Sequence, residues 1–576
     1  MTEACHGSVA SSVTIRAVNP EAQEHLLGQG ISPLMARLYA AREIHDIAQL
    51  ATDLSALLAP QLMLGITQMA AHLADAIAAQ RKLLIIADYD ADGATACAVG
   101  LRALRQFGAT VDYLVPNRFE YGYGLTPEIV ALAITQHQPD ILITVDNGIA
   151  SIDGVAAANA AGIKVLITDH HLPGDHLPDA WCIVNPNQPG CTFPSKHLAG
   201  VGVIFYVMLA LRAELRERGT YRTQTEPNLS QWLDLVALGT VADVVKLDDN
   251  NRRLVEQGLQ RIRNGRSQAG IQALLAAAGR EHERVGTYDL GFVVGPRLNA
   301  AGRLTDMSLG IECLTTNDAT RAAEIAAQLD QLNHQRRDIE ADMQASALAE
   351  LAEIPSGYTL SVYHPQWHQG VIGILASRLR EQFHRPTFAF ATGAAGELKG
   401  SGRSIPGLHL RDALDLISKR QPQLILRFGG HAAAAGLTIA ESAFATFQHA
   451  FESVAQELLS AADLTRQWVT DGPLAVTEAT LAQADIIATH VWGQGFPEPR
   501  FFDQFKVIHQ RIVGTRHLKL RLAREAVLFE AILFGQAEFL PEQIEASYRL
   551  STNHYTGAST LQLIIEHWQP VSENNL

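Results

Sequence analysis

LLIIADYDADG, residues 83–93, is the stretch of sequence that decides the fold. Its apolar run, Leu83 to Ile86, predicts a short buried strand. Residues two apart on an extended chain point the same way, so carboxylates at that spacing share one face and repel each other. Such a cluster usually needs a cation to be tolerated. The three carboxylates, closed by Gly93, are Asp88, Asp90 and Asp92.

Two other interpretations compete for this motif. The pattern D-x-D-x-D-G matches the first half of a calcium-binding EF-hand loop, which requires a glutamate at its twelfth position. That position holds Val99 here, and a strand rather than a helix precedes the motif, so the sequence argues against a calcium loop. An acidic turn without a ligand stays open for this stretch taken alone.

Length and composition bound the class of protein. The 576 residues, 47% apolar and 18% charged, allow roughly three domains of an ordinary globular protein. The five cysteines include no C-x-x-C pair, so we expect no disulfide framework and no cysteine zinc site, which fits a reducing cytoplasm. We expect no signal peptide, because the N-terminal segment lacks a basic region and an apolar core. The net charge of −15 argues against a general nucleic-acid coat but permits a basic groove on an acidic body.

Helices and strands are expected to alternate from residue 66 to residue 168. The expected strands are almost continuously apolar and are separated by helices, which predicts an α/β domain with a parallel sheet covered on both faces. Ligands of such sheets bind beyond the carboxyl ends of the strands. The expected helices cover 66–80, 94–107, 126–136 and 154–161, and the expected strands cover 83–87, 111–115, 141–145 and 165–168.

Polar motifs follow the strands of this expected sheet. DNG at 146–148 and DHH at 169–171 each come after a strand, and Asp243 lies in GTVADVV. Each motif alone could be a turn or a surface pair. Together they predict a converging cluster of carboxylates and imidazoles, which favours a catalytic divalent cation such as Mg²⁺ or Mn²⁺. The ligands suffice for two ions about 3.5–4 Å apart, an arrangement that serves phosphoester displacement.

The polar motifs resemble, in order, those of the DHH phosphoesterase superfamily, which takes its name from the triplet at 169–171. They read DYDADG, TVDNG, ITDHH and GTVADVV. Longer motifs are similar to those of the bacterial single-strand-specific 5′-to-3′ DNA exonucleases of this superfamily. The resemblance covers residues 65–440 and, more loosely, the C-terminal part. The longer motifs are PNRFEYGYGL (116–125), GPRLNAAGRL (295–304), WHQGVIGILASRL (367–379) and GGHAAAAGLT (429–438).

The resemblance implies two Mn²⁺ or Mg²⁺ ions and the residues that hold them. The first motif of the superfamily commonly reads H-x-x-x-D-x-D; Ile86 stands at the histidine position, and Asp88 is expected to take its role. Asp146 is expected to bridge the ions, whereas the division of the three aspartates of 88–92 between them stays open. His171 is either a ligand or a contact to the scissile phosphate, and Asp169 orients its neighbours. The implied metal ligands are Asp88, Asp90, Asp92, Asp146, His170 and Asp243, and the implied catalytic group is Asp146, Asp169, His170 and His171.

Two segments of the catalytic region, a loop at 116–125 and the motif at 295–304, are candidates for binding the DNA strand. In 116–125, glycine lets the backbone approach a ligand closely, an arginine offers charge, and tyrosines could stack on bases. The alternative is a turn-rich loop with packed aromatic residues. In 295–304, arginines and an asparagine are candidates to bind the phosphates of the strand. The candidates are Arg118, Tyr121, Tyr123, Arg297, Asn299 and Arg303.

A second phosphate site is expected in the following domain. The glycine-rich segments KGSGRS and GGHAAAAG resemble the substrate pocket of the DHH-associated domain, where side chains and backbone N–H groups would hold the 5′-terminal phosphate. The alternative is a tight connection between strands. The candidates are Arg403, Ser404, Gly429, Gly430 and His431.

Changes in composition and in the expected helices and strands along the chain predict its division into domains. Residues 318–350 contain no proline or glycine and predict one long helix that joins two domains. Beyond about 465, short alternating strands predict a β-rich domain, and residues 500–524 carry seven Lys or Arg against one acid. Lys519 and Arg521 alternate with leucines there, as in an OB-fold single-strand binder, although an unrelated β domain with a solvated face is the alternative. The expected parts are an N-terminal extension (1–65), a DHH catalytic domain (66–317), the connecting helix (318–350), a smaller α/β DHH-associated domain (351–462) and an OB-like domain (463–576).

These features predict a metal-dependent exonuclease that removes 5′-mononucleotides from single-stranded DNA by two-metal hydrolysis, in DNA repair and recombination. The first alternative is a phosphoesterase of the same superfamily acting on nanoRNA, cyclic dinucleotides or polyphosphate. The second is a DNA-binding scaffold without metals, against which the intact carboxylates argue. We expect a cytoplasmic monomer without membrane association, and the resemblance implies cooperation with a helicase and a single-strand-binding protein.

Overall fold

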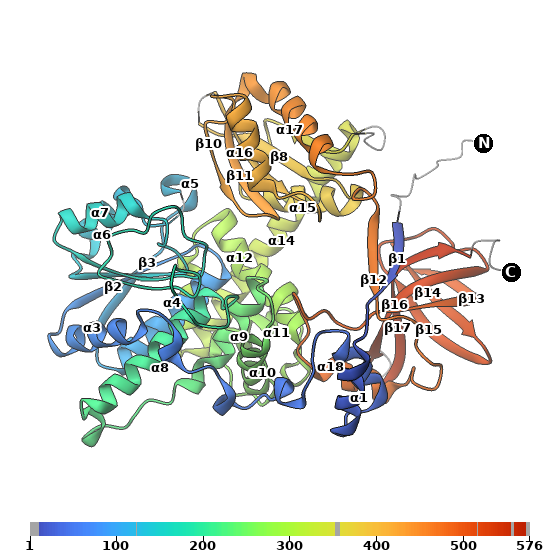
Figure 1. Ribbon diagram of the computed structural model, residues 1–576, viewed down its shortest axis with the longest axis horizontal. Helices are drawn as coiled ribbons and strands as arrows, with labels where there is room; N and C mark the ends of the chain where they lie inside the picture. The colour runs from blue at the N-terminus through green and yellow to red at the C-terminus, as the bar shows by residue number, and fades with distance from the viewer. Residues whose placement is uncertain are drawn as a thin grey trace. The chain divides into compact units, whose positions relative to one another are not determined.

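The computed structural model describes residues 11–122, 124–351, 357–394, 396–514, 516–554 and 558–571. The chain forms two compact units. The smaller contains residues 334–470 together with the N-terminal strand, and the larger contains residues 16–333 together with the C-terminal segment from 471. In Figure 1, where colour follows residue number, each unit therefore combines two colours that are distant in sequence.

A parallel sheet forms the first part of the larger unit. Its strand order is β3-β2-β4-β5-β6, and every neighbouring pair is parallel. Leu83 and Ile85 join the core on one face, whereas Leu84 and Ile86 join the core on the other. The predicted fold of this region is confirmed, although the sequence pattern did not indicate β6. The strands are β2 (Lys82–Ala87), β3 (Thr110–Leu114), β4 (Ile141–Val145), β5 (Lys164–Thr168) and β6 (Cys182–Val184).

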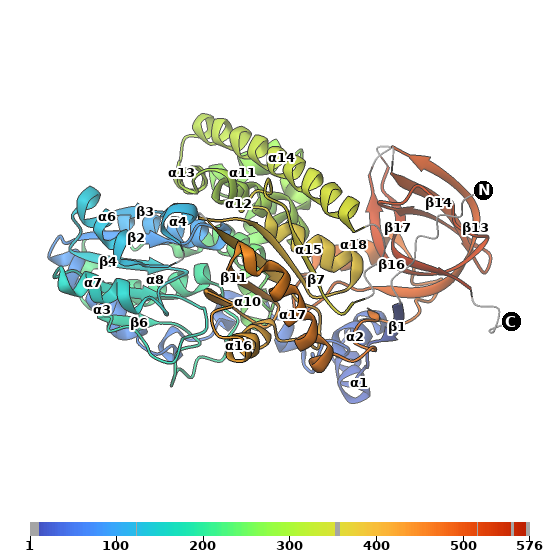
Figure 2. The ribbon, with the colours of Figure 1, turned by 90° about the horizontal axis from the view of Figure 1, so that it is seen from above.

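Helices cover both faces of this sheet, as the two views of Figures 1 and 2 show. Three of them bury apolar residues in the core that contains Leu83, and two bury theirs in the core that contains Leu84. This double cover is the reason why the strands read as nearly continuous apolar runs. The first group is α3 (Ile66–Ala78), α4 (Ala91–Gln106) and α8 (Gly200–Glu217), and the second is α6 (Pro127–His137) and α7 (Ile152–Ala160).

A helical region follows the sheet in the larger unit. A π-helical turn, Asp289–Val294, runs directly into α12 within this region. The predicted long helix is α14 (Ala319–Glu350), which continues from the larger unit into the smaller one. The other helices are α9 (Leu233–Ala242), α10 (Asp249–Arg263), α11 (Ala269–Ala277), α12 (Gly295–Leu304) and α13 (Ser308–Thr315).

The C-terminal part of the larger unit is a closed barrel. The strand order is β13-β14-β15-β17-β16, and only the β15–β17 pair of this described barrel is parallel. Leu518, Leu520 and Leu522 point into its core and leave Lys519 and Arg521 on the outside. The predicted OB-like domain is confirmed. Its elements are α18 (Leu481–Thr489), β13 (Phe501–Val513), β14 (His517–Arg524), β15 (Val527–Leu533), β16 (Gln543–Asn553) and β17 (Thr560–Pro570).

The smaller unit is a second α/β domain built on a mixed sheet. The strand order is β10-β11-β9-β8-β7, with β7 and β8 parallel and the other pairs antiparallel. The N-terminal strand β1 (Ser11–Ile15) pairs in parallel with β12 (Arg466–Thr470) in this unit. The remaining elements are β7 (Leu360–Tyr363), α15 (Ile372–Phe383), β8 (Thr387–Thr392), β9 (Glu397–Arg403), α16 (Leu410–Arg420), β10 (Arg427–Gly430), β11 (Ala434–Ala440) and α17 (Phe444–Leu458).

A buried ion pair fastens the N-terminal helices α1 (Pro20–Gly28) and α2 (Pro33–Ala40) to the start of the barrel region. Arg42 donates from both terminal nitrogens to the two carboxylate oxygens of Asp471, each at 2.8 Å. The side chains are 0% and 2% exposed. The Arg42 Nε–H also donates to the carbonyl of Pro497, and the backbone N–H of Arg500 donates to Asp471. Every charge in the pair is therefore matched by fixed partners.

Among the described residues, no single helix is long and apolar enough to cross a membrane. A bent pair, Leu54–Leu62 with Ile66–Ala78, meets that test by length and composition only, with 86° between its two parts.

Replacing Asp471 by Asn is expected to lower the free energy of unfolding of the larger unit by about 3–5 kcal/mol, because the Arg42 guanidinium would stay buried without its counter-charge. Chemical denaturation followed by tryptophan fluorescence measures this loss. Lys506→Ala is the matched control, since its ion pair with Glu542 is exposed at 56% and 71%. An Asp471→Asn midpoint equal to that of the control would contradict the assignment.

Candidate metal centre

The first carboxylates lie between β2 and α4. Asp90 is the N-cap of α4, and its Oδ1 accepts hydrogen bonds from the backbone N–H groups of Asp92 and Gly93 at 2.9 and 3.0 Å. A Cβ added to Gly93 would lie 2.5 Å from the carbonyl oxygen of Asp88. Glycine is therefore required for the tight turn that brings Asp88 back against the helix.

A second helix N-terminus holds Asp92. Its side chain is buried, and its two oxygens accept from the backbone N–H groups of Gly200 and Val201, at 2.6 and 2.8 Å, at the start of α8. The positive end of a helix dipole stabilises a carboxylate in this position. A Cβ on Gly200 would lie 2.6 Å from the Cβ of Asp146, so glycine also lets α8 approach that aspartate.

Two residues at the centre have a left-handed backbone. Asp146, directly after β4, has a φ of 63° and is 1% exposed. Val244, directly after Asp243, has a φ of 61°. Positive φ is uncommon for aspartate and is strained for a β-branched residue. Strain of this kind persists where the surrounding structure imposes it, and it clusters at functional sites.

The DHH triplet follows β5 and meets the carboxylates. The Nε2 atom of His170 lies 3.1 Å from Asp146 Oδ1, 3.4 Å from Asp243 Oδ2 and 3.9 Å from Asp92 Oδ2. The Nδ1 of His171 lies 2.8 Å from Asp169 Oδ1. Asp169 also accepts from the backbone N–H groups of Ile149 and His170, so it fixes the loop as well as the His171 ring.

Overlapping sets of ligand atoms lie within 4.8 Å of one another in the described part of the chain. Asp146 belongs to two of these sets, one with the aspartates after β2 and one with the two histidines. The arrangement brings together every predicted metal ligand. The sets are Asp88, Asp90 and Asp146; Asp92, His170 and Asp243; and Asp146, His170 and His171.

Bringing these carboxylates together disfavours their ionised forms, as their raised pKa values show. Burial raises the pKa of Asp92 to about 7, the charge of Asp90 adds to the shift, and the N–H groups of Val201 and Gly200 oppose it. Burial, followed by the repulsion of the neighbouring aspartates, raises the pKa of Asp146 and of Asp243 well above the ordinary value. A bound cation would relieve this repulsion, so the donor set of carboxylate oxygens and imidazole fits Mg²⁺ or Mn²⁺.

The pKa values of Asp169 and His171 both shift in the direction that favours the ionised form of each side chain. Burial alone would lower the pKa of His171, but its hydrogen bond to Asp169 and the charges of Asp169, Asp88 and Asp90 raise it to about 9. Burial alone would raise the pKa of Asp169, but the hydrogen bond and charge of His171 outweigh it and hold this pKa below the ordinary value. The pair is therefore an imidazolium held by a carboxylate at neutral pH.

Comparison with known proteins identifies the family of the chain that carries this cluster. The description "DHH family, N-terminal domain" matches residues 82–240, "DHHA1 domain" matches residues 356–457, and "RecJ OB domain" matches residues 470–567. The single-stranded-DNA-specific exonuclease RecJ of Dickeya dadantii is 50% identical over 563 residues, which are 95% of this chain and 97% of that protein. The chain belongs to the RecJ family.

Solved RecJ structures share the whole fold. The crystal structure of RecJ from Thermus thermophilus in complex with Mn²⁺ covers 98% of this chain and 80% of its own length, with a TM-score of 0.82 and 28% identity. The structure of the same protein with Mg²⁺ gives a TM-score of 0.77 at 27% identity, covering 98% of this chain and 79% of its own length. The predicted fold class, a parallel-sheet DHH domain followed by DHH-associated and OB-like domains, is thus confirmed.

Other predicted residues of this RecJ-family chain take structural positions around the cluster. Arg297 donates to Asp330 of α14 at 2.8 and 2.9 Å and to the carbonyl of Val293 at 2.7 Å, which holds it on its own domain. Asn299 accepts from the backbone N–H of Ala91 at 2.8 Å and so supports the loop of Asp90. Their roles as DNA contacts stay predictions.

The loop at 116–125 is described only in part. Tyr121 ends the short helix α5 (Arg118–Tyr121) and packs partly buried against the core of α6. Tyr123 and the side chain of Arg118 lie outside the described residues. Arg303 is half-buried near the end of α12. Phosphate or base contacts of this loop are untested.

The predicted phosphate site of the smaller unit lies where β9 and the β10–β11 hairpin pair. Arg403 donates to the carbonyl of Gly402 at 2.8 Å, and burial lowers its pKa. The Ser404 hydroxyl donates to the carbonyl of Leu408 at 2.8 Å. Gly429 and His431 are exposed, and Gly430 has a φ of 140°, where a Cβ would lie 2.5 Å from the carbonyl oxygen of Ala434. The hairpin therefore depends on glycine whether or not it binds phosphate.

Sequence reasoning missed the backbone donors at the start of α8. Gly200 and Val201 hold Asp92 through N–H groups, and a Cβ on Gly239 of α9 would lie 2.9 Å from Asp92 Oδ1. The signal was the pair of glycines that opens an apolar helical run at 200–211. A close approach of backbone to a charged group is a regular reason for glycine at such positions.

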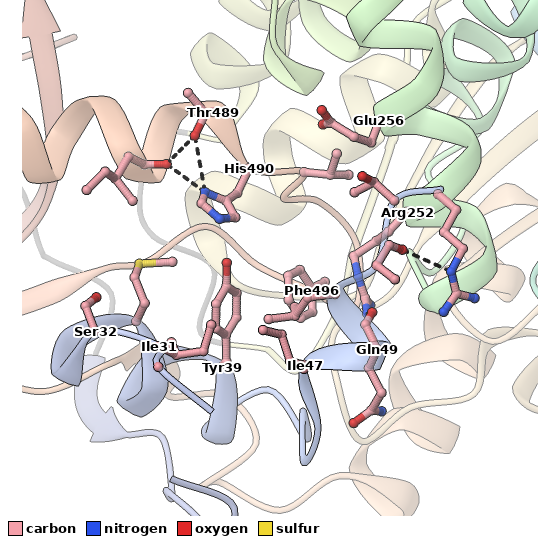
Figure 3. Close-up of a pocket in the computed structure, with 18 of the residues that line it drawn as sticks. Ile31, Ser32, Tyr39, Ile47, Gln49, Arg252, Glu256, Thr489, His490 and Phe496 are labelled. Atoms are coloured by element: carbon pink, nitrogen blue, oxygen red, sulfur yellow. Dashed lines mark hydrogen bonds between the residues drawn. The ribbon is translucent and has the colours of Figure 1, made fainter. Parts of the chain in front are cut away.

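A cavity of about 570 Å³ lies in the larger unit and contains none of the predicted site residues. It is formed by α2, the segment 47–52, α10 and the segment 486–496. In Figure 3 the hydroxyl of Tyr39 points toward His490, whose ring centroid is 5.8 Å from that of Tyr39. Arg252 lies over the ring of Phe496 at 4.2 Å and donates to the carbonyl of Gln49. The cavity marks the seam between the N-terminal helices and the barrel region.

The metal-free protein is expected to lose stability as the pH rises from about 6 to about 9. The pKa of Asp92 is about 7 against 3.8 for the ordinary side chain, and that of His171 is about 9 against 6.5, so the folded state binds more protons than the unfolded state in this range. The loss is on the order of 1–3 kcal/mol. Thermal unfolding in a chelator at several pH values measures it.

Two variants control this experiment. Asp92→Asn should reduce the dependence below about pH 7, and His171→Asn should reduce it above, while Asp146 and Asp243, whose pKa values are also raised, keep a remaining slope. Unfolding midpoints of the unaltered protein that stayed constant, or rose, over this range would contradict the assignment of the shifted groups.

Proposed function

We propose that the chain is a single-strand-specific DNA exonuclease that releases 5′-mononucleotides in the 5′-to-3′ direction and acts in DNA repair and recombination. One observation carries the proposal: the converging carboxylate–histidine cluster lies in a chain that is half identical to a RecJ exonuclease over almost its full length. The three matched domains occur in the order DHH, DHHA1 and RecJ OB. The domain limits stay a proposal as predicted: an extension to residue 65, then parts ending at 317, 350, 462 and 576.

We propose that the cluster holds two Mn²⁺ or Mg²⁺ ions. The Thermus structures contain these metals, and the donor set here is rich in carboxylate oxygen. One ion would be held by Asp88, Asp90 and Asp146, and the other by Asp92, His170 and Asp243. Asp146 would serve both, because its Oδ1 lies 3.1 Å from His170 Nε2. When bound, divalent ions of this kind supply a water activated as nucleophile and charge that stabilises the leaving oxygen.

The protein's own groups prepare this site for a phosphodiester. Asp92 stays fixed because two backbone N–H groups hold its oxygens, which limits the reorganisation on binding. In the metal-free protein, the hydrogen bond to Asp169 and the charges of Asp169, Asp88 and Asp90 raise the pKa of His171 to about 9, so that its ring is protonated at neutral pH, and Asp169 fixes its Nδ1. Its Nε2–H is then the donor for a phosphoryl oxygen, where an added negative charge develops during hydrolysis.

The barrel is proposed to bind the strand. On β14, Lys519 and Arg521 alternate with buried leucines, and both lie beside Glu530 of β15, at 3.8 and 2.9 Å. Arg511 of β13 is exposed and stands opposite Lys519 in register. This local excess of cations on a chain of net charge −15 supports an electrostatic track for phosphates.

The finer partners follow from this role. An exonuclease that degrades single strands in repair needs strands opened by a helicase and covered by a single-strand-binding protein, so we propose both as partners of a cytoplasmic monomer. Sedimentation of the purified protein with each of them tests the association and the monomeric state together.

Asp146→Ala should abolish hydrolysis while binding of a single-stranded oligonucleotide stays within a few-fold of the unaltered protein, because this residue belongs to two sets of ligand atoms, one with Asp88 and Asp90 and one with His170 and His171. Turnover with Mn²⁺ and fluorescence anisotropy measure the two properties. Asp53→Asn, which changes an exposed aspartate whose side chain makes no capping hydrogen bond, is the control and should keep its turnover. Turnover of Asp146→Ala like that of the unaltered protein would refute the metal assignment.

The function itself is tested by digesting a single-stranded 50-mer labelled first at its 5′ end and then at its 3′ end, beside the duplex. Early release of labelled mononucleotide from the 5′ end, with the duplex untouched, is expected. A surviving 50-mer combined with rapid cleavage of di- to tetranucleotides would instead identify a phosphoesterase for small substrates.

Replacing Arg511, Lys519 and Arg521 together by Ala should weaken binding of the 50-mer and lower the slope of log K against log salt by about 2, since each phosphate contact to a single strand contributes roughly 0.7. Hydrolysis of a dinucleotide should not change. Titrations over a range of salt concentrations measure the slope, and an unaltered slope would show that this face of the barrel does not carry the strand.

A further inference from the structure

An exposed pair of aromatic side chains lies near the carboxylate cluster and takes no part in the site described above. The rings of Tyr288 and Phe292 stack with centroids 5.2 Å apart and 28° between their planes. Tyr288 is 58% exposed and Phe292 is 72% exposed, the largest fraction among the large apolar side chains of the described residues. We call this pair the aromatic platform.

The platform stands on an unusual piece of backbone. Tyr288 immediately precedes the π-helical turn Asp289–Val294, and Phe292 lies within it. The turn continues without a break into α12, so it is a π-bulge at the start of a longer helix. Such bulges are rare and occur frequently at functional sites. Here the bulge presents two large rings to solvent instead of burying them.

Two glycines seat this turn on the element that carries Asp243. A Cβ on Gly291 would lie 3.2 Å from Val241 Cγ1, and a Cβ on Gly295 would lie 3.2 Å from the Cβ of Ala242. Val241 and Ala242 form the end of α9, and Asp243 comes directly after them. The helices α9 and α12 lie side by side in Figure 1. The platform is therefore fixed within a few residues of the cluster by backbone packing.

A second connection joins the platform to the same cluster from the other side. Asn299, further along α12, accepts from the backbone N–H of Ala91 in the turn that contains Asp90. Val244, which follows Asp243, is itself 64% exposed. The elements that carry the platform thus also position the carboxylates, through the end of α9 before Asp243 and through the turn of Asp90.

The chemistry of the exposed surface selects the group. Two large rings left in water forgo the free energy of burial unless a ligand covers them. A single DNA strand whose phosphate reaches the cluster carries flat, unpaired bases on either side of that phosphate. Bases stack on aromatic rings irrespective of sequence, because every base has a π-face. A base is therefore a better match to the outer face of Phe292 than a charged or aliphatic group.

We propose that the pair Tyr288–Phe292 is a stacking platform for a nucleobase of the single-stranded substrate and positions the strand so that its phosphate meets the carboxylate cluster. The proposal rests on the proposed function, and it deepens it by naming a positioning site that acts without reading sequence. Phe292 offers the open face, and Tyr288 supports the ring from behind.

The test uses the full-length protein and single-stranded oligonucleotides with 2-aminopurine placed at each of the first positions in turn. Stacking on Phe292 should quench the fluorescence at one position, and Phe292→Leu, which keeps the apolar bulk without the π-face, should remove that quenching. The same variant should raise KM for the strand about tenfold and leave kcat within twofold, as expected for the loss of one stacked base. Phe292→Trp should restore both signals.

A matched control and a binding measurement separate the outcomes. Ile134→Ala removes a large apolar side chain that is 36% exposed on α6, and it should change neither KM nor the fluorescence. Binding of the 2-aminopurine strands to Asp146→Ala tests the platform without hydrolysis, so a protein that binds strands with the expected quenching but cleaves only small substrates would refute the exonuclease alone. Unchanged quenching and KM in Phe292→Leu, or a protein that binds no strand, would overturn the platform.

Discussion

The mutual repulsion of buried carboxylates at the carboxyl edge of the parallel sheet is the constraint on which this structure depends. Asp92, Asp146 and Asp243 are brought together although burial and their neighbours' charges disfavour ionisation of each. The fold compensates locally: Asp90 caps α4, and the start of α8 donates two backbone N–H groups to Asp92. The left-handed backbone at Asp146 and Val244 is a further departure from relaxed geometry at this cluster. A protein without a cation to bind has no physical reason to maintain such an arrangement.

Much of this was predictable from the sequence because the decisive signals are local. Apolar runs that end in aspartate identify buried parallel strands and the edge at which ligands gather, and the structure brings all six predicted ligands together. The features that the sequence did not reveal depend on contacts between residues that are far apart along the chain. No pattern indicated that α8 would supply donors to Asp92, 108 residues away, or that Arg297 would be engaged by Asp330. The π-bulge beneath Phe292 was equally hidden, since no pattern in the sequence marked residues 289–294.

The charge distribution explains how an acidic protein can handle nucleic acid. Its net charge is −15, while five of the seven cations of residues 500–524 lie on strands β13 and β14 of the barrel. An acidic body repels a polyanion except along a cationic track or at a metal centre. Under the proposal that the barrel binds the strand, affinity and chemistry are assigned to different domains.

The ion pair between Arg42 and Asp471 has a consequence for the folding of the chain during its synthesis on the ribosome. Its partners are separated by 429 residues, and at translation rates of 5–20 residues per second a ribosome needs roughly 20–90 s to add that much sequence. The helices α1 and α2 emerge first and yet obtain their buried counter-charge among the last. For that interval the Arg42 side chain has no Asp471 carboxylate to pair with. The fold thereby makes completion of the amino-terminal region depend on synthesis of the segment that begins the barrel region.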